Sequence, residues 1–172
     1  LSLPLAKQAK VLDLGTGTGA IALALASENP DWMITGIDKS QDAVDLANEN
    51  ARLNMQKVTF KKSDWFSALA QQQFDLIVSN PPYIENDNAY LKQGDVRFEP
   101  ASALTSGVEG LDDIQFIVAK SKKHMLKNAW LVIEHGYQQH LQVSAIFNQH
   151  GFTDIRTEYD LNDLPRVTLA RL

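Results

Sequence analysis

Residues 11–26 decide the fold and read Val11-Leu12-Asp13-Leu14-Gly15-Thr16-Gly17-Thr18-Gly19-Ala20-Ile21-Ala22-Leu23-Ala24-Leu25-Ala26. The apolar run before the glycines is typical of a strand that is buried on both faces. The run after them consists of strong helix formers, and Asn29-Pro30 ends it. The stretch therefore predicts a strand, a glycine-rich turn and a helix in succession.

The same alternation continues along the chain. Apolar runs predict further strands at 32–37, 58–61, 74–79, 129–134, 153–157 and 167–172. Helices are expected at 41–53, capped by Ser40, from Asp112 or Asp113 to Met125, and at 138–148. The apolar face of the first should comprise Val44, Leu46, Ala47, Ala51 and Leu53, and the C-terminal end of the second should carry Lys120, Lys122, Lys123 and Lys127. This order predicts an α/β fold with a doubly wound, mostly parallel sheet of seven strands, closed by a C-terminal hairpin with one antiparallel member.

Length and composition narrow the class of protein. A chain of 172 residues, 44% of them hydrophobic, predicts one globular domain that spans residues 1–172. Its net charge of -5 argues against a protein that binds nucleic acid by neutralising many phosphates. The sequence contains no cysteine, which fits a reducing compartment, and the first residues show neither a signal peptide nor a membrane span. A cytoplasmic protein without membrane partners is the expectation.

The glycine loop indicates a nucleotide-like ligand, because open α/β sheets bind ligands at the carboxyl ends of their strands. Gly15, Gly17 and Ala20 satisfy the dinucleotide fingerprint, and Asp38 lies near the distance expected for an acid that binds a ribose. NAD therefore stays open at this point. However, Asp13 precedes the loop, and a carboxylate there would repel a pyrophosphate and attract a cation. The balance favours a cationic nucleoside that carries no phosphate.

Asn80-Pro81-Pro82-Tyr83 follows the predicted strand 74–79. Methyl transfer requires a nucleophile whose lone pair is aimed at the methyl group, and a planar amide or aryl nitrogen is a poor nucleophile. The Asn80 side-chain oxygen and the Pro81 carbonyl could accept both N–H groups of such a nitrogen, while the prolines stiffen the turn and Tyr83 offers a packing wall. These four residues are the predicted catalytic and substrate-binding residues.

These motifs carry a resemblance. The segment Asp13-Leu14-Gly15-Thr16-Gly17-Thr18-Gly19 resembles the first motif of class I S-adenosylmethionine-dependent methyltransferases. It is similar to the HemK/PrmC family of release factor glutamine methyltransferases when taken together with the segments Ser63-Asp64-Trp65-Phe66, Asn80-Pro81-Pro82-Tyr83-Ile84, Phe98-Glu99-Pro100 with Ala103-Leu104, Glu134-His135-Gly136 and Arg166-Val167-Thr168-Leu169. The resemblance spans nearly the whole chain and implies the class I, Rossmann-like fold. It also implies that the cofactor S-adenosylmethionine is bound by Gly15, Thr16, Gly17, Thr18, Gly19, Asp38, Asp64, Trp65 and Asn80, with Asp38 on the ribose and Asp64 and Trp65 at the adenine.

The resemblance also implies a substrate, which is the glutamine of the Gly-Gly-Gln tripeptide in class I peptide chain release factors. Methylation would occur on its side-chain amide nitrogen. Members of the family normally carry an N-terminal helical domain, which these 172 residues do not contain, so the chain is expected to be the catalytic domain alone. Asn128-Ala129 stands where the family shows two glycines, and asparagine tolerates the left-handed conformation that a helix C-cap can require.

Four alternatives remain open. A glutamine methyltransferase acting on a ribosomal protein would use the same turn, and Asp95 to Pro100 is the reason to prefer release factors. An adenine-amine methyltransferase would need a basic groove for DNA or RNA. A NAD-dependent oxidoreductase and a non-catalytic nucleotide-binding module are the other two. His135, His140 and His150 lack the spacing of metal ligands, so no metal is expected. Glu134 and His135 could shape the pocket, and a functional loop is expected at 85–106.

Overall fold

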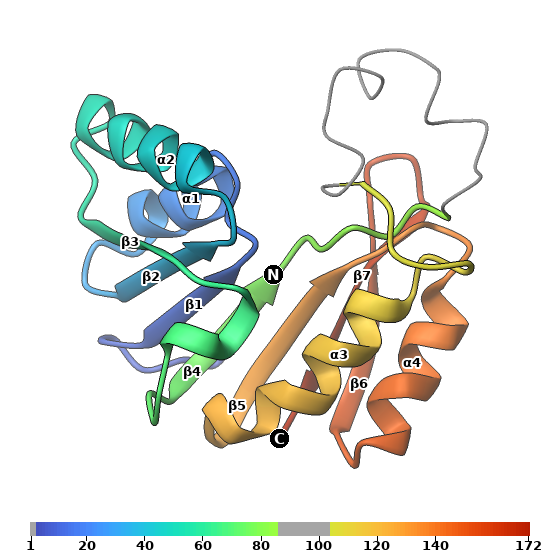
Figure 1. The fold of residues 1–172 in the computed structure, drawn as a ribbon. Helices are drawn as coiled ribbons and strands as arrows, with labels where there is room; N and C mark the ends of the chain where they lie inside the picture. Colours follow the sequence, from blue (N-terminus) through green and yellow to red (C-terminus); the bar gives the residue numbers. More distant parts are fainter. Residues whose placement is uncertain (1–2, 86–103) are drawn as a thin grey trace.

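One sheet organises the molecule. In the computed structural model, which describes residues 3–85 and 104–172, the described strands form a seven-stranded sheet in the order β3-β2-β1-β4-β5-β7-β6 (Figure 1). Its strands are β1 (Lys10–Leu14), β2 (Met33–Asp38), β3 (Val58–Lys62), β4 (Phe74–Ser79), β5 (Met125–Glu134), β6 (Thr153–Tyr159) and β7 (Pro165–Arg171). The helices are α1 (Ala20–Glu28), α2 (Gln41–Leu53), α3 (Asp112–Ser121) and α4 (His140–Gln149), with short 3-10 helices η1 (Trp65–Ala68) and η5 (Lys122–His124).

The strand directions confirm the predicted architecture. Strands β1 to β5 are parallel to one another. Among the described strands, only β7 runs against both of its partners, because it lies between β5 and β6 and pairs antiparallel with each. The sheet is therefore mostly parallel, and its C-terminal hairpin supplies the one antiparallel member.

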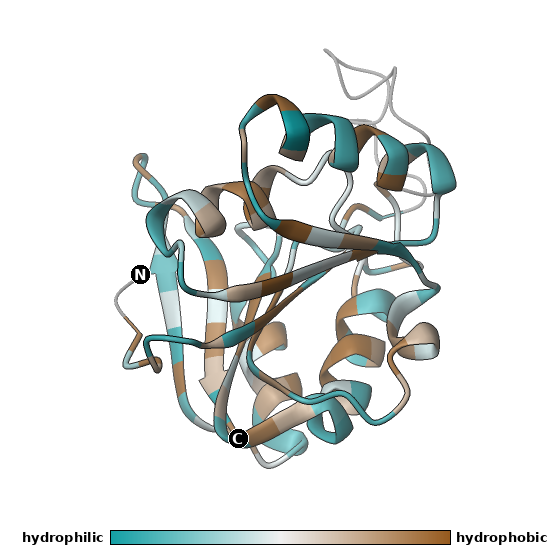
Figure 2. Cartoon of the chain, turned by 90° about the vertical axis from the view of Figure 1, so that its left-hand side faces the viewer, coloured by the Kyte–Doolittle hydropathy of each residue, from teal (hydrophilic) through white to brown (hydrophobic). Residues whose placement is uncertain are grey.

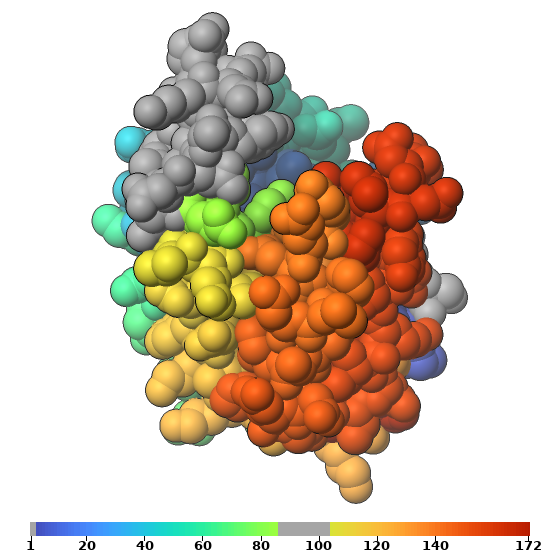
Figure 3. All heavy atoms as spheres, turned by 90° about the vertical axis from the view of Figure 1, so that its right-hand side faces the viewer, coloured from blue at the N-terminus to red at the C-terminus, as the bar shows by residue number. Residues whose placement is uncertain are grey.

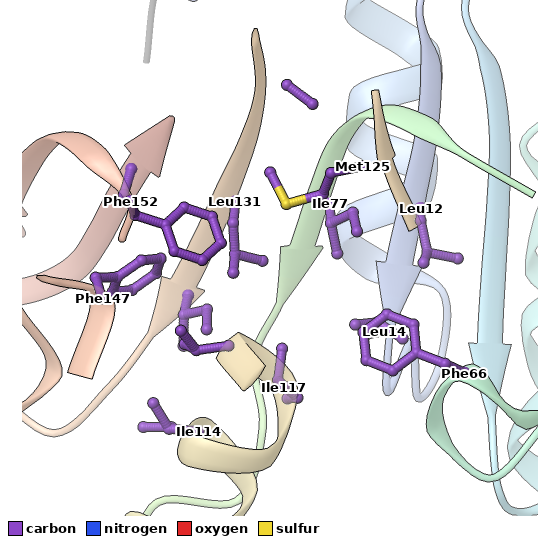
Figure 4. Close-up of a cluster of buried hydrophobic side chains, with 14 of the residues drawn as sticks. Leu12, Leu14, Phe66, Ile77, Ile114, Ile117, Met125, Leu131, Phe147 and Phe152 are labelled. Atoms are coloured by element: carbon purple, nitrogen blue, oxygen red, sulfur yellow. The ribbon is translucent and has the colours of Figure 1, made fainter. Parts of the chain in front are cut away.

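Two hydrophobic cores lie on opposite faces of the sheet, because successive side chains of a strand point to opposite faces. Leu12 of β1 and Leu131 of β5 join the core under α3, α4 and η1, part of which is drawn in Figure 4. Their neighbours Val11 and Val132 join the core under α1 and α2. Figure 2 shows helices on both faces, with apolar residues along the strands between them. Buried on both faces, the central strands read as continuous apolar runs, and this is why the sequence located them.

The boundary between α3 and β5 differs from the prediction. The helix ends at Ser121, and Met125, expected in the helix, begins β5 four residues before the predicted start at 129. His124 stacks on Phe66 at 4.8 Å between ring centroids, and Met125 is 2% exposed and pairs with Phe74. These tertiary contacts override the helical propensity of the lysine-rich segment.

Two smaller expectations about this region are also corrected. Lys127 lies in β5, whereas the sequence placed it at a helix end. Asn128 takes the left-handed conformation anticipated for it, with a φ of 67°, but it does so inside β5, where the pairing with β4 is irregular. No helix C-cap lies there.

The predicted face of α2 is only half right. Val44, Ala47 and Ala51 are buried, whereas Leu46 and Leu53 are exposed by 44% and 62%. The Ser40 cap is confirmed, because its hydroxyl accepts a hydrogen bond from the Ala43 N–H. The remaining helices and strands agree with the prediction to within about two residues, which is the ordinary uncertainty of element ends.

The strand order brings the polar motifs to one edge. Because β1 to β5 are parallel, the residues that follow them all lie at the carboxyl edge of the sheet.

No helix in the described part of the chain is long and apolar enough to span a membrane.

Candidate functional site

The glycine loop joins β1 to α1 in a conformation that requires glycine. Gly15, Gly17 and Gly19 have φ values of 69°, 54° and 82°, in the left-handed region that other residues avoid. A side chain at Gly19 would also collide with Phe60, because its Cβ would lie 2.9 Å from the ring. A Cβ at Gly17 would meet nothing within 4 Å, so the backbone there is open to a ligand.

The buried side chain of Asp13 holds the glycine loop through hydrogen bonds. Its side chain is 1% exposed, and its Oδ2 accepts hydrogen bonds from the Thr16 hydroxyl at 2.6 Å and the Ala22 N–H at 3.2 Å. Its Oδ1 has no hydrogen-bond partner within the described residues. Burial raises the pKa of Asp13 from 3.8 to about 6, because loss of water outweighs the two hydrogen bonds. Asp13 therefore ties the start of α1 to β1.

This buried carboxyl makes stability depend on pH. The folded protein binds the Asp13 proton more tightly than the unfolded chain does, so its contribution to the free energy of unfolding decreases as pH rises from about 4 to about 6. Asp13→Asn removes this dependence and leaves the other titrations unchanged. We expect the stability difference between wild type and variant to fall by about 1 kcal/mol between pH 5 and 7.5, measured by urea unfolding. A difference that stays constant over this range would contradict the assignment.

Asp38 lies at the end of β2 and reaches the same loop. Its Oδ2 accepts from the Gly17 N–H and its Oδ1 from the Ser40 N–H, each at 2.9 Å. One carboxylate thus fixes both the glycine loop and the entry to α2. The sequence placed Asp38 at the loop but did not show that it holds the loop backbone.

Trp65 and Asp64 follow β3 and complete this side of the edge. Trp65 has a φ of 44°, and its ring lies 3.7 Å from the position a Cβ on Gly15 would occupy. Ser63 is buried, and its hydroxyl donates to the Trp65 carbonyl at 2.6 Å and accepts from the Ala68 N–H. The structure therefore brings Trp65 to the glycine loop, while Asp64 is exposed beside it.

The turn after β4 lies directly beside the turn after β1. Leu14 and Ser79 are paired in the sheet, and the Ser79 hydroxyl donates to the Leu14 carbonyl at 2.8 Å. Asn80 is consequently adjacent to the start of the glycine loop. Asn80 is exposed, whereas Pro81 is buried. Asn80 is therefore open to solvent at the edge where the other motifs meet.

Tyr83, Glu134 and Arg166 join this turn to the C-terminal half. The Tyr83 hydroxyl donates to Glu134 Oε1 at 3.4 Å. Burial raises the pKa of Glu134, although Tyr83 and the nearby Arg166 partly oppose this. Glu134 therefore contacts the turn, as anticipated for a residue at the end of β5.

The histidines do not form a metal site in the described residues, where no cluster of three or more candidate ligands occurs. His135 is buried; its Nε2 lies 2.8 Å from the Thr168 hydroxyl and its Nδ1 3.0 Å from the Gly136 carbonyl. Burial lowers the pKa of His135. This residue therefore links the end of β5 to Thr168 of β7.

Some predicted site residues lie outside the described part of the chain, and some residues that contact the site were not predicted. The segment Asp95 to Pro100 and most of the predicted loop 85–106 lie outside the described residues. Conversely, sequence reasoning missed Ser79, Gly110 and Gln139, which contact the Asn80 to Tyr83 turn or its flanks. Gln139 gave no separate signal, because it follows an identical neighbour in Gly136-Tyr137-Gln138-Gln139.

Comparison with known proteins gives three kinds of match. A family model described as the methyltransferase small domain matches residues 1–109. A curated Shewanella oneidensis protein named release factor glutamine methyltransferase is 48% identical over 172 residues, which is 99% of this chain and 60% of that protein. An Escherichia coli protein of the same name is 50% identical over 163 residues, 94% of this chain and 59% of that protein. The chain thus spans about 60% of the length of these relatives.

Solved structures resemble the chain in fold. A methyltransferase from Pyrococcus furiosus superposes with a TM-score of 0.73 at 14% identity, over 95% of this chain and 75% of that one. A Thermus thermophilus 16S rRNA N2 G1207 methyltransferase in complex with AdoMet and guanosine has a TM-score of 0.66 at 22% identity, over 95% of this chain and 37% of that one. At 14% and 22% identity, these matches show a shared fold only.

Proposed function

Because this chain belongs to the methyltransferase small domain family and has the class I methyltransferase fold that its sequence predicted, we propose that it is the catalytic domain of a protein-glutamine methyltransferase. In this proposal, residues 1–172 transfer a methyl group from S-adenosylmethionine to the side-chain amide nitrogen of a glutamine. The substrate is the Gly-Gly-Gln tripeptide of class I peptide chain release factors, recognised as a protein without direct binding to nucleic acid.

The observation that carries the proposal is the contact between the two turns. The Ser79 hydroxyl links the start of the Asn80 turn to the Leu14 carbonyl, which precedes the glycine loop. A cofactor on the glycine loop and a planar amide on Asn80 would therefore be neighbours. The juxtaposition of the two turns supports methyl transfer better than either turn alone.

The residues of the loop fit the cofactor. The open backbone at Gly17 allows close approach of a ligand. The buried Oδ1 of Asp13, which has no hydrogen-bond partner among the described residues, would favour a cationic ligand near the loop. Asp38 would accept from the ribose hydroxyls while still holding the Gly17 N–H. Trp65 and Asp64 would contact the adenine. The loop residues Gly15, Thr16, Thr18 and Gly19, together with Asn80, complete the proposed cofactor site.

When bound, the cofactor supplies an electrophilic methyl group on a positively charged sulfur. The Asn80 side-chain oxygen and the Pro81 carbonyl accept the two N–H groups of the substrate amide and so orient its nitrogen. Pro82 keeps the turn rigid, and Tyr83 packs against the substrate. The methyl group would pass from the sulfur to this nitrogen, and the proton that the nitrogen loses would pass to water. The chain contributes position and electrostatics rather than a general base.

The names of the curated relatives support release factors as substrate, and the net charge of -5 agrees with a protein partner better than with a nucleic acid. A ribosomal protein is the second candidate, because glutamine methylation there would use the same turn. NAD-dependent oxidoreduction and non-catalytic nucleotide binding leave the Asn80 turn without a role.

The test uses this chain within its full-length protein. Calorimetry should show binding of S-adenosylmethionine and no binding of NAD, and labelled cofactor should methylate a class I release factor. The matched control is the same release factor with the glutamine of its tripeptide replaced by alanine, which should stay unlabelled. Label on a ribosomal protein alone would move the proposal to the second substrate, and binding of NAD alone would refute it.

A further inference from the structure

We propose that Gln139 is a positioning residue for methyl transfer, which it supports by clamping the Asn80 to Tyr83 turn from the C-terminal side. This inference rests on the proposed function for its kinetic consequence only. The clamp itself is a matter of geometry that can be measured without catalysis.

Gln139 connects three segments through its side-chain amide. Its Nε2 donates to the Tyr83 carbonyl at 3.0 Å and to the Glu109 carbonyl at 3.0 Å, and its Oε1 accepts from the Gly136 N–H at 2.8 Å. A glutamine amide has two N–H donors and one acceptor oxygen, so both of its ends are engaged. The turn after β4, the segment before α3 and the turn after β5 are thereby joined at one side chain. Figure 3 shows the three segments meeting on one face, in green, yellow and orange.

Gly110 leaves the space that this clamp needs. It has a φ of 69°, and a Cβ there would lie 2.2 Å from the Tyr83 carbonyl oxygen and 2.9 Å from Gln139 Nε2. The glycine, the carbonyl and the amide are therefore in close contact. A side chain at position 110 would therefore displace the Tyr83 carbonyl or the Gln139 amide.

The turn depends on such external contacts because Pro81 and Pro82 have no N–H groups with which to anchor it. Its start is fixed by the hydrogen bond from Ser79 to Leu14, and its end by the bond from Gln139 to Tyr83. Asn80 lies between these two anchors. A displacement of about 1 Å at a reacting group can reduce a rate roughly a hundredfold, so loss of one anchor should reduce turnover through the position of Asn80.

The neighbouring glutamine provides a matched control. Gln138 is exposed, and its Nε2 donates to the Tyr137 hydroxyl at 3.1 Å, away from the turn. Gln139→Glu keeps the acceptor for the Gly136 N–H but removes the donors, and it places a carboxylate against carbonyl oxygens. Gln139→Met removes the donors without adding charge and guards against misfolding of the first variant. Gln138→Glu makes the same change in charge one residue away.

Two measurements test the inference on the full-length protein. Amide hydrogen exchange should become faster in both Gln139 variants at Ile84 and Ser106, whose N–H groups bond to Leu104 and Ile84 just beyond the clamp. The kcat for methylation should fall about tenfold to a hundredfold, while the Kd for S-adenosylmethionine stays within about twofold of wild type. Gln138→Glu should leave exchange and kcat unchanged.

The outcomes separate the inference from the proposed function. Unchanged exchange at Ile84 and Ser106 in both Gln139 variants overturns the clamp, and unchanged kcat in the presence of faster exchange overturns its role in positioning. A wild-type protein that methylates no release factor contradicts the proposed function. In that case the exchange measurement still decides whether Gln139 holds the turn.

Discussion

Asn80→Ala is expected to reduce methyl transfer by roughly a hundred- to a thousandfold while leaving the affinity for S-adenosylmethionine nearly unchanged. The change removes the side-chain acceptor that orients the substrate nitrogen, and loss of one preorganised hydrogen-bonding group at a reacting centre has effects of about this size. Binding should survive because the loop backbone, Asp38 and Trp65 remain. Single-turnover assays with labelled cofactor and a release factor, combined with calorimetry, measure the two quantities separately.

Two further variants give this experiment its controls. Asn80→Asp keeps an acceptor oxygen at the same position and should retain more activity than the alanine variant. Asn54→Ala removes an exposed asparagine at the end of α2, where its amide donates to the Asn50 carbonyl, and should have wild-type activity. The role assigned to Asn80 is refuted if the alanine variant methylates at the wild-type rate.

Asp38→Asn is expected to weaken binding of S-adenosylmethionine about tenfold to a hundredfold. The Asp38 carboxylate accepts from two backbone N–H groups, those of Gly17 and Ser40, and an asparagine has only one acceptor oxygen to satisfy them. Hydrogen bonds to a charged group are worth about 1.5 to 3 kcal/mol, and about 1.4 kcal/mol changes an affinity tenfold. The variant should therefore lose both a ribose acceptor and the fixed position of the loop. Calorimetry on the purified protein measures the affinity.

The matched control is Asp45→Asn on α2. Asp45 is exposed and accepts from the Gln41 amide, an interaction that asparagine can also make. The Asp45→Asn substitution changes the net charge by the same amount as Asp38→Asn and leaves the contacts of the glycine loop unchanged. Equal affinities of the Asp38 and Asp45 variants would show that the effect of Asp38 is only one of overall charge, contrary to its assignment.

Where the sequence was informative, the reason is physical. A strand buried on both faces is apolar throughout, so β1 and β4 could be located from their residue types alone. A left-handed turn favours glycine, so the glycine loop could be located in the same way. The α3 to β5 boundary could not be located in this way. It depends on the stacking of His124 on Phe66 and the pairing of Met125 with Phe74, which are contacts between segments about 50 residues apart.

The sequence by itself determined the order of strands and helices, the glycine loop, and the Asn80-Pro81-Pro82-Tyr83 turn, because each depends on local residue chemistry. Only the tertiary structure decided how these parts are held together. Asp13 beneath the loop, Ser79 between the two turns and Gln139 at Tyr83 act through hydrogen bonds to atoms that the fold brings into reach. A polar side chain in a sequence shows what it can donate or accept, whereas its partner is fixed by the packing of the whole chain. That is why two adjacent glutamines, identical in sequence chemistry, differ in that one faces solvent and the other clamps the site.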